Sequence, residues 1–280
     1  MRAIIAERTV ELIGCDTMPN ADKFALFEHD FHTADCTIRV TVHDKLEKPC
    51  GQDFQRIGDW IRVRTDDRRI VCGHKNGTAV YEADEDYRDV HVRLHRQLSS
   101  LDAYHYLHVS RMFQNHLQRN GGCLIHSSGI KIENSGLALC GRSGAGKTTM
   151  TRLLQQEVPR MRVLCDDSPA IRTDGESPVL YGTPFCGQDE CCANDRAPLK
   201  GLVFLKQAPH DRVVELSPPE AMYQLLTVMQ RSALDDTMMQ AMTDRLVTII
   251  QHVPIVCFEN RGTADSAKYI LDYASKHGIL

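Results

Sequence analysis

One eight-residue segment, Gly141 to Thr148 with the sequence GRSGAGKT, leaves this chain few folds to choose from. It satisfies the pattern G-x-x-x-x-G-K-[ST] at every fixed position, and the apolar run Leu137–Cys140 precedes it while a helix-prone stretch follows. In such a strand, loop and helix, glycines let backbone N–H groups converge on phosphate oxygens, and the helix N-terminus adds partial positive charge. The segment therefore predicts a phosphate-binding loop in an α/β domain. The alternative is a chance match in a glycine-rich turn.

The positions of this loop predict how a nucleoside triphosphate is held. Lys147 is expected to reach the β- and γ-phosphates of ATP, and Thr148 is expected to ligate Mg²⁺. The motif leaves the position of Arg142 variable, which favours a solvated side chain there. The residues expected to bind the nucleotide are Gly141, Ser143, Gly144, Ala145, Gly146, Lys147, Thr148 and Thr149.

Two adjacent carboxylates follow the loop at the end of the next strand-like run. The apolar segment Met161–Cys165 leads directly into Asp166-Asp167. Carboxylates in this place can divide two tasks, because one can hold Mg²⁺ while the other accepts a proton from an attacking hydroxyl group. Adjacent acids are also common in surface turns. The phosphate-binding loop before them favours the catalytic interpretation.

Composition and charge exclude several classes of function. The chain has 280 residues, of which 42% are hydrophobic and 25% charged, so it can bury a substantial core. A formal net charge of −4 gives no reason to expect nucleic acid, because unspecific binding needs a basic surface. Charged residues interrupt the N-terminal segment, and no apolar stretch approaches the roughly 18 residues of a membrane span. We expect a soluble cytoplasmic protein without nucleic-acid or membrane partners.

Residues 1–98 have the pattern of a small antiparallel domain rich in β-strands. Asn76-Gly77 indicates a hairpin whose two central residues both have positive φ. The expected strands are Phe24–Glu28, Thr37–His43, Trp60–Arg64, Ile70–Gly73, Thr78–Glu82 and Val90–Leu94. Residues 99–121 have apolar side chains at helical spacing and predict a linking helix, which Ser99 with Asp102 could cap and Gly121-Gly122 would end.

Residues 122–280 combine strands and helices around the phosphate-binding loop. The expected strands are Cys123–His126, Gly129–Glu133, Leu137–Cys140, Arg162–Cys165, Ala170–Thr173 and Leu202–Leu205. The expected helices are Ala145–Glu157, Pro218–Met229, Asp235–Gln251 and Ala264–His277. The methionines of the C-terminal helices indicate helix packing, and a peptide-binding groove is the alternative.

The order of several motifs resembles one known family. His126 stands fifteen residues before Gly141, the strand and loop Gly136–Thr148 follow, and Cys165-Asp166-Asp167 comes next with Ile171-Arg172 behind it. This order resembles the catalytic domain of the HPr kinase/phosphorylase family, whose P-loop sheet is related to that of phosphoenolpyruvate carboxykinases. The resemblance covers roughly residues 124–205. Residues 183–199 look like a segment of the shorter HPr-kinase-like proteins that accompany peptide-modifying gene clusters, some of which phosphorylate serine on a ribosomal precursor peptide.

The resemblance implies a role for each matching residue. Asp166 would be the general base, Asp167 would hold Mg²⁺ with Thr148, and His126 would orient or tune Asp166. Arg196 would neutralise charge on the transferring phosphoryl group. The chain also departs from the family, because Thr149 stands where the bifunctional enzymes usually carry an acidic residue and their long glycine-containing signature segment has no clear copy. These departures count against HPr as substrate and against the reverse reaction.

The sequence therefore predicts an Mg-ATP-dependent kinase acting on a serine or threonine hydroxyl of a protein or peptide. One alternative is a nucleotide-binding regulator without phosphotransfer, which would not need both Asp166 and Asp167. Another is a kinase of a small hydroxylated metabolite, because acceptor pockets have no portable motif. Assembly into a homo-oligomer is left open.

The cysteines could form disulfides, bind a metal or remain free thiols. Their odd number, eleven, fits reduced and mostly buried thiols better than a disulfide framework. The spacing of Cys186, Cys191 and Cys192 does not suit a zinc site, which pairs its ligands as C-x₂₋₄-C. We expect buried thiols, of which Cys191 or Cys192 could lie close enough to the site to make the protein sensitive to oxidation.

Overall fold

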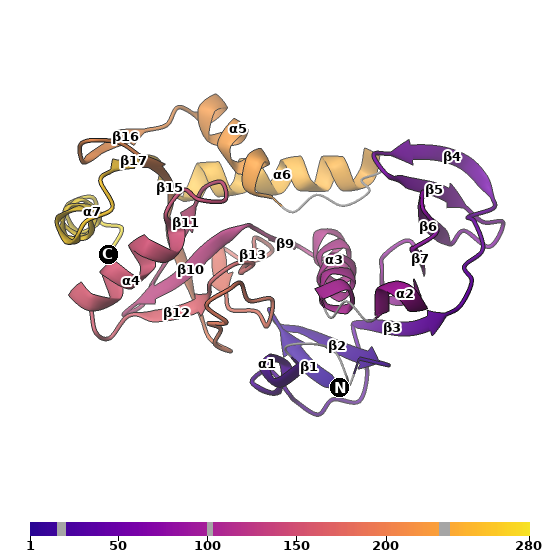
Figure 1. The fold of residues 1–280 in the computed structure, drawn as a ribbon. Helices are drawn as coiled ribbons and strands as arrows, with labels where there is room; N and C mark the ends of the chain where they lie inside the picture. Colours follow the sequence, from indigo (N-terminus) through magenta and orange to yellow (C-terminus); the bar gives the residue numbers. More distant parts are fainter. Residues whose placement is uncertain (16–20, 100–102, 230–235) are drawn as a thin grey trace. The chain divides into compact units, whose positions relative to one another are not determined.

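The computed structural model describes residues 1–15, 21–99, 103–229 and 236–280, which form both strands and helices (Figure 1). Two units are distinguished by their internal contacts. The first comprises Met1–Asn120 with Arg231–Met238, and the second comprises Gly121–Gln230 with Met239–Leu280. Both units contain strands and helices, which confirms the mixed α/β class expected from the sequence.

The first unit is built on an eight-stranded sheet. Its strands are β1 (Arg2–Ile5), β2 (Arg8–Ile13), β3 (Cys36–His43), β4 (Gln52–Ile57), β5 (Trp60–Arg64), β6 (Ile70–His74), β7 (Ala79–Ala83) and β8 (Asp89–His95). They lie in the order β1-β2-β3-β8-β7-β6-β5-β4. The expectation of a purely antiparallel sheet is wrong, because β3 pairs in parallel with both β2 and β8. The intervening strands β4 to β7 form a meander that returns β8 to the side of β3 in the same direction.

The N-terminal hairpin of this sheet was not predicted. Ala6 and Glu7 connect β1 to β2, and both have positive φ, at 49° and 60°. Such a turn normally carries Asn or Gly, so its sequence gives no signal. The predicted strand Phe24–Glu28 is also wrong, because α1 (Ala21–Ala25) occupies its first part. Phe24 and Phe27 are both buried, and their spacing of three residues suits a helical turn rather than a strand.

The hairpin at Asn76-Gly77 is confirmed, with β6 and β7 as its arms. Its turn is longer than predicted, and only Gly77 of the two central residues has positive φ, at 65°. The N–H of Gly77 donates to the carbonyl of His74, which closes the turn. Two helices follow, α2 (Arg96–Ser99) and α3 (Ala103–Arg119), and the predicted end of the long helix before Gly121 is confirmed. The predicted cap by Ser99 requires Asp102, which lies outside the described residues.

The second unit is built on a nine-stranded sheet around one long strand. Its strands are β9 (Gly122–Leu124), β10 (Ser127–Ile132), β11 (Ser135–Cys140), β12 (Arg162–Cys165), β13 (Ala170–Arg172), β14 (Val179–Tyr181), β15 (Arg196–Gln207), β16 (Arg212–Glu215) and β17 (Ile255–Asn260). The first residues of β15 pair antiparallel with β14, and its later residues pair in parallel with β11 and β17. Strands β14, β16 and β17 were not predicted.

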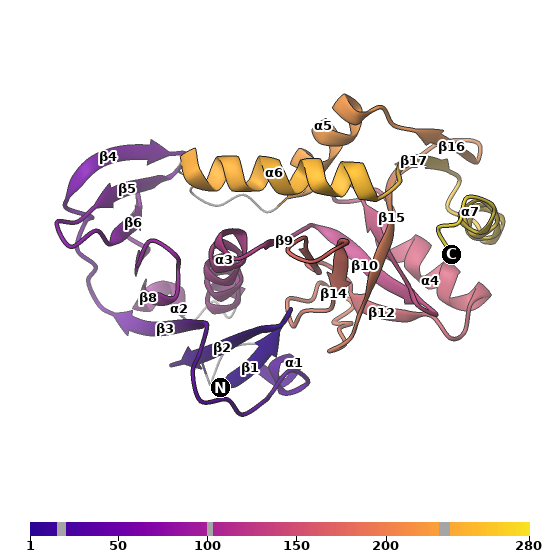
Figure 2. The same cartoon turned by 180° about the vertical axis from the view of Figure 1, so that it is seen from behind.

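Four helices complete the second unit, within one or two residues of their predicted bounds: α4 (Lys147–Glu157), α5 (Pro218–Val228), α6 (Asp236–His252) and α7 (Ala264–Lys276). Helices α4 and α7 lie side by side (Figure 2). Their apolar side chains meet those of β10, β11, β15 and β17 in one buried cluster. Met150 and Leu154 of α4 and Ile270 of α7 belong to it. This packing fixes α4, and with it the loop that precedes α4.

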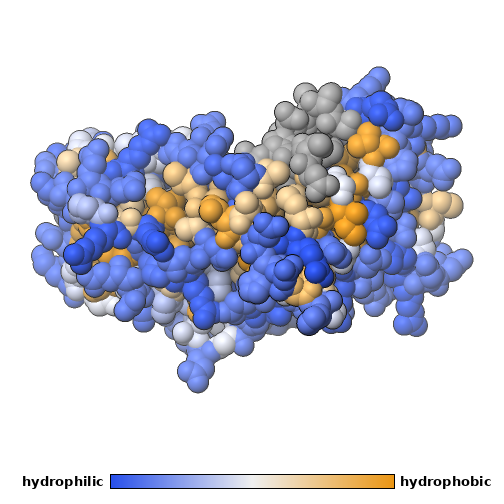
Figure 3. Space-filling model, turned by 90° about the horizontal axis from the view of Figure 1, so that it is seen from below, coloured by the Kyte–Doolittle hydropathy of each residue, from blue (hydrophilic) through white to orange (hydrophobic). Residues whose placement is uncertain are grey.

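The surface is mostly hydrophilic on the face drawn in Figure 3, in keeping with the charged fraction of the sequence. Within the described residues, no helix is both long and apolar enough to cross a membrane.

Candidate active site

Residues Gly141–Gly146 connect β11 to α4, and Lys147 and Thr148 are the first two residues of α4. Gly141, Gly144 and Gly146 all have positive φ, at 152°, 81° and 97°. A Cβ atom at Gly141 would lie 2.7 Å from the Cβ of Ala145. Glycine is therefore required at Gly141 both by its backbone conformation and by this close approach. This glycine-rich turn lies directly before the N-terminus of α4, a place at which an anion can bind.

Lys147 lies at the start of α4 with its ammonium group directed back over the loop. Its Nζ donates to the carbonyl of Gly141 at 2.8 Å and lies 3.1 Å from Nε2 of His126. Burial lowers the pKa of Lys147, although the charge of Asp167 acts in the opposite direction. Gln207, at the end of β15, donates from Nε2 to the carbonyl of Gly144 at 3.0 Å and supports the other side of the loop.

His126 connects this lysine to the carboxylate pair. It precedes β10, and its Nδ1 lies 2.9 Å from Oδ1 of Asp167. The two contacts assign one tautomer, in which Nδ1–H donates to the carboxylate of Asp167 and Nε2 accepts from the ammonium group of Lys147. The implied contact between His126 and Asp166 is thereby corrected, since the bound carboxylate belongs to Asp167. Asp166 and Asp167 follow the end of β12 in a bend, and His126 binds only one of them.

The carboxylate of Asp167 is stabilised as an anion. Burial alone would raise its pKa, but hydrogen bonds from His126 and Ser168, together with the charge of Lys147, lower it overall. Ser168 Oγ donates to Oδ2 at 2.7 Å, so both carboxylate oxygens have a donor. Asp167 is therefore ionised at neutral pH and held in one orientation.

Asp166 is held by a loop from the other side. Its Oδ1 accepts from the N–H of Gly187 at 2.7 Å, and its Oδ2 accepts from the N–H of Asp189 at 3.0 Å. Burial raises the pKa of Asp166, against these two hydrogen bonds. Gly187 permits the approach, because a Cβ atom there would lie 3.2 Å from Oδ2 of Asp166. We call the residues 187–191 the cradle loop.

Asp166 and Thr148 line the same cavity, of about 230 Å³. Its other oxygen-bearing side chains are those of Ser128, Thr151, Gln155 and Asp189. These hard oxygen donors suit Mg²⁺, which is bound in nucleotide sites by one or two carboxylates together with phosphate oxygens. Among the described residues, no cluster of three or more His, Cys, Asp and Glu side chains could hold a metal by itself. The residues thus fit an Mg²⁺ ion that arrives with a nucleotide.

Several residues of this site were not predicted. Thr151 donates to Ser128 at 2.9 Å, and Arg152 forms an ion pair with Asp189 at 2.7 Å. Thr151 and Arg152 lie three and four residues after Thr148, so the helical period of α4 could have placed them beside it. Ser128 and Asp189 carry no such signal, because only the tertiary fold brings them here.

Arg196, Ser143 and Thr149 are not among the residues that line this cavity. Arg196 opens β15 and is exposed, with its Cζ 5.9 Å from the centre of the Tyr181 ring. Ser143 and Thr149 are exposed on the loop and on the first turn of α4. The structure therefore brings together Lys147, His126 and Asp167, and separately Thr148 with Asp166.

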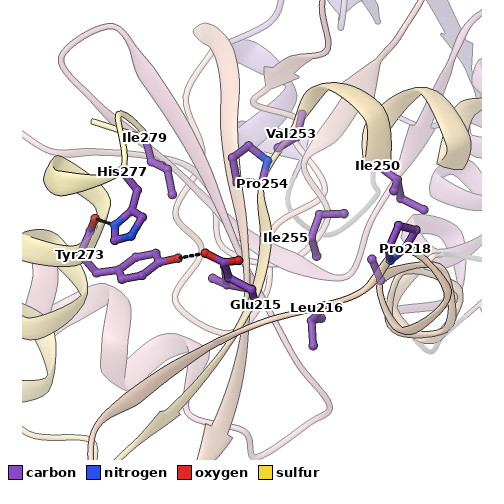
Figure 4. Close-up of a pocket in the computed structure, with 12 residues that line it drawn as sticks. Glu215, Leu216, Pro218, Ile250, Val253, Pro254, Ile255, Tyr273, His277 and Ile279 are labelled. Carbon is purple, nitrogen blue, oxygen red and sulfur yellow. Dashed lines mark hydrogen bonds between the residues drawn. The ribbon is translucent and has the colours of Figure 1, made fainter.

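A second cavity of about 360 Å³ lies among the C-terminal elements of this unit (Figure 4). Its lining is mostly apolar, with Ile255 and Ile279 among the residues. Its polar groups bind one another, because the hydroxyl of Tyr273 donates to Glu215 at 3.5 Å and Nδ1 of His277 donates to the carbonyl of Tyr273 at 2.8 Å. It shares no lining residue with the first cavity, and we assign it no part in the chemistry.

Comparisons with known proteins leave the function to be argued from this geometry. No family model matches the chain, and no curated protein matches it. Among solved structures, the chain is similar to the Hpr(Ser) kinase/phosphatase from Coxiella burnetii, with 12% sequence identity and a TM-score of 0.30. The alignment covers 55% of this chain and 89% of that one. A likeness this distant decides neither the activity nor the substrate.

Proposed function

We propose that this chain is an Mg-ATP-dependent kinase that transfers the γ-phosphoryl group of ATP to a hydroxyl group. The observation that carries the proposal is the series of contacts from Lys147 through His126 to Asp167, beside a phosphate-binding loop. A protein that only binds a nucleotide needs the loop and its lysine. It has no use for an ionised carboxylate held by a histidine that also contacts this lysine.

Residues 141–148 bind the nucleotide, and the cradle loop positions the metal-binding carboxylate of Asp166. Backbone N–H groups of residues 141–148 and the ammonium group of Lys147 bind the phosphates. Thr148 and Asp166 would hold Mg²⁺, which supplies positive charge that screens the phosphate oxygens. The raised pKa of Asp166 agrees with this role, because a partly buried carboxylate facing the loop is completed by a cation. Asp166 thus takes the metal-binding role that the family resemblance implies for Asp167.

Asp167 then acts as the general base, with His126 as the residue that orients it. The acceptor hydroxyl gives its proton to the carboxylate of Asp167 while its oxygen attacks the γ-phosphorus and the bond to the ADP oxygen breaks. The pKa directions alone would favour Asp166 as base, since its pKa is raised. Geometry outweighs this argument, because Asp166 shares its cavity with Thr148 and Asp167 does not line that cavity.

The acceptor is proposed to be a serine or threonine of a peptide or protein. The support is the resemblance of residues 183–199 to a segment of peptide-modifying kinases, together with the place of the cradle loop against Asp166. Arg196 belongs to the same segment and is proposed to contact the substrate or the moving phosphoryl group. A small hydroxylated metabolite is the competing acceptor.

The proposal is tested by following the γ-phosphate of labelled ATP. The purified chain is incubated with Mg²⁺ and either a set of serine- and threonine-containing peptides or a set of hydroxylated metabolites, and the products are separated. Label on peptide hydroxyl groups is expected. Label on a metabolite would move the acceptor to the other class, and ATP bound without any transfer would leave a nucleotide-binding regulator.

A further inference from the structure

A third cavity, of about 390 Å³, lies in the first unit, where a segment of the chain crosses the eight-stranded sheet. Strands β3 and β4 follow each other in sequence, but four other strands lie between them in the sheet. We call the residues that connect them, 44–51, the crossing segment. A Cβ atom at Gly73 of β6 would lie 2.5 Å from Cγ of Pro49, and Leu46 packs against a buried cluster that includes Val80 of β7. The crossing segment therefore lies on one face of the sheet.

The two faces of this sheet differ in polarity. Arg93 of β8 is paired with Thr41 of β3 and with Val80 of β7, so these three side chains share the face that the segment crosses. Val92 and Leu94, on either side of Arg93, lie on the opposite face and are fully buried. The crossed face therefore carries the polar side chains that a ligand can reach.

The cavity between the crossing segment and the sheet combines cations with apolar groups. Lys45 and Lys48 are exposed, and Arg93 keeps 33% of its side chain accessible. Val71 and Val80 are buried and form the apolar part of the lining. The cavity is thus positively charged at its exposed part and apolar at its buried part.

The protein neutralises these cations only in part. Among the described residues, neither Lys45 nor Lys48 forms an ion pair. Arg93 shares the carboxylate of Glu82 with Arg69, at 3.4 Å and 2.7 Å respectively. The lining itself contains three cations and one carboxylate, that of Glu47. On a chain with a formal net charge of −4, this positive surface is a local feature that suits an anionic ligand.

The remaining features of the cavity favour a peptide as this ligand. The backbone of residues 45–50 forms no hydrogen bond with another described residue, so its polar groups can pair with those of an extended peptide. Carboxylates of the peptide would meet the three cations, and an apolar side chain would cover the two valines. Nucleic acid fits less well, because no Phe, Tyr or Trp on which a base could stack is among the described residues that line the cavity.

We propose that this cavity binds an acidic segment of the peptide substrate that carries an apolar side chain and is distinct from the residue that is phosphorylated. That the peptide is a substrate rests on the kinase function proposed above. The volume of about 390 Å³ lies within the range of roughly 300–1,000 Å³ that is typical of ligand-binding pockets. The first unit thus recognises the peptide, and the second unit carries the residues that transfer the phosphoryl group.

The first test measures peptide binding by the full chain in the absence of ATP. The probe is a fluorescein-labelled peptide in which glutamates flank a single leucine, without serine or threonine. Its fluorescence anisotropy should rise on titration with the protein, and the affinity should fall as sodium chloride is added. Replacing the leucine by glycine should weaken binding by about tenfold.

Three results of this titration would overturn the proposal. One is the absence of binding. Another is equal binding of a matched peptide with lysines in place of the glutamates. The third is displacement of the probe by inorganic phosphate or by polyuridine at an ionic strength matched with sodium chloride, because the site would then take a small anion or a nucleic acid.

A pair of lysine variants tests whether the cavity is the binding site. Lys48→Glu replaces an attraction by a repulsion and should raise the Kd of the probe by about 3- to 10-fold. Lys75→Glu is the matched control, because it makes the same change of charge in the first unit at a lysine that pairs with Asp59 and does not line the cavity. This control should bind the probe like the wild type. Equal effects of the two variants would contradict the proposed site.

An exposed cysteine of the lining reports the position of the bound peptide. The probe should slow the alkylation of Cys50 by iodoacetamide, measured by mass spectrometry. Alkylation of Cys191, an exposed cysteine of the second unit, should keep its rate. A bound probe that leaves Cys50 unprotected would place the peptide elsewhere and overturn the proposal.

Phosphotransfer provides a separate measurement. With a serine peptide that carries the acidic segment, Lys48→Glu should raise KM by about 3- to 10-fold and leave kcat unchanged. With the same serine peptide lacking that segment, neither constant should change. A lower kcat with an unchanged KM would contradict a role in recognition. The binding and alkylation measurements need neither ATP nor an acceptor, so they decide the site even if no phosphotransfer is found.

Discussion

The imidazole of His126 is bound to the carboxylate of Asp167, with 2.9 Å between Nδ1 and Oδ1. Because Nε2 of the same ring lies 3.1 Å from Nζ of Lys147, the histidine contacts both the lysine at the start of α4 and one member of the carboxylate pair. The other member, Asp166, faces the cavity of Thr148. The two adjacent acids thus have different neighbours, and their roles can be separated by experiment.

Replacing the loop lysine tests the phosphate site. Lys147→Ala removes the charge that faces the β- and γ-phosphates, so turnover should be abolished and affinity for Mg-ATP should fall strongly. Titration with a non-hydrolysable ATP analogue and a steady-state assay measure the two effects. Near-normal phosphotransfer would show that residues 141–148 are not the nucleotide site.

Removing one carboxylate at a time separates the metal ligand from the base. Asp167→Asn should keep Mg-nucleotide binding while the chemical step slows by roughly 10²- to 10⁴-fold, as when a general base is lost. Asp166→Asn should weaken the Mg²⁺ dependence of nucleotide binding, because it withdraws charge from the metal's ligands. Calorimetric titration with Mg²⁺ and single-turnover rates measure both. The opposite pattern would restore the roles expected from the family resemblance.

The lowered pKa of Asp167 predicts a pH-dependent contribution to stability. Its native pKa lies below its ordinary value of 3.8, so the ionised carboxylate stabilises the folded state above about that pH. This contribution is lost as the pH falls through the native pKa. The difference in free energy of unfolding between wild type and Asp167→Asn, measured with urea, should therefore be larger at pH 7 than at pH 3. An equal difference at both values would contradict the stabilised anion.

The backbone of the loop can be tested with a matched pair of glycines. Gly141→Ala places a Cβ atom 2.7 Å from that of Ala145 at a φ of 152°, so it should lower stability by about 1–3 kcal/mol and weaken nucleotide binding. Gly175→Ala is the control, because a Cβ atom there meets nothing within 4 Å. Thermal unfolding and nucleotide titration of both variants compare them. Equal behaviour of the two variants would argue against a strained loop at Gly141.

The sequence predicts a phosphate-binding loop at residues 141–148 because the signal is local. A fixed spacing of Gly141, Lys147 and Thr148 between an apolar run and a helix determines one backbone arrangement. The carboxylate pair was found by the same kind of signal. Their roles could not be separated, because these depend on tertiary contacts: the cradle loop binds Asp166, whereas His126 binds Asp167.

The misassigned elements have similar physical causes. Ala6 and Glu7 both have positive φ although neither is Gly or Asn. Local residue preferences therefore do not predict the first hairpin. The buried pair Phe24 and Phe27 lies in a segment whose apolar residues predict a strand, although a spacing of three residues suits a helical turn. The strand β17 has a plainly apolar sequence, and its place beside β15 is decided by tertiary pairing.

The central claim is that this chain transfers a phosphoryl group from ATP to a hydroxyl group, with Asp167 as the general base. It is tested most directly by mass spectrometry of serine- and threonine-containing peptides after incubation with Mg-ATP and the wild type, Lys147→Ala or Asp167→Asn. The account predicts an added phosphate on serine or threonine with the wild type, none with Lys147→Ala, and a rate lower by roughly 10²- to 10⁴-fold with Asp167→Asn. A wild-type chain that binds Mg-ATP and phosphorylates no peptide, or an Asp167→Asn variant as fast as the wild type, would contradict it.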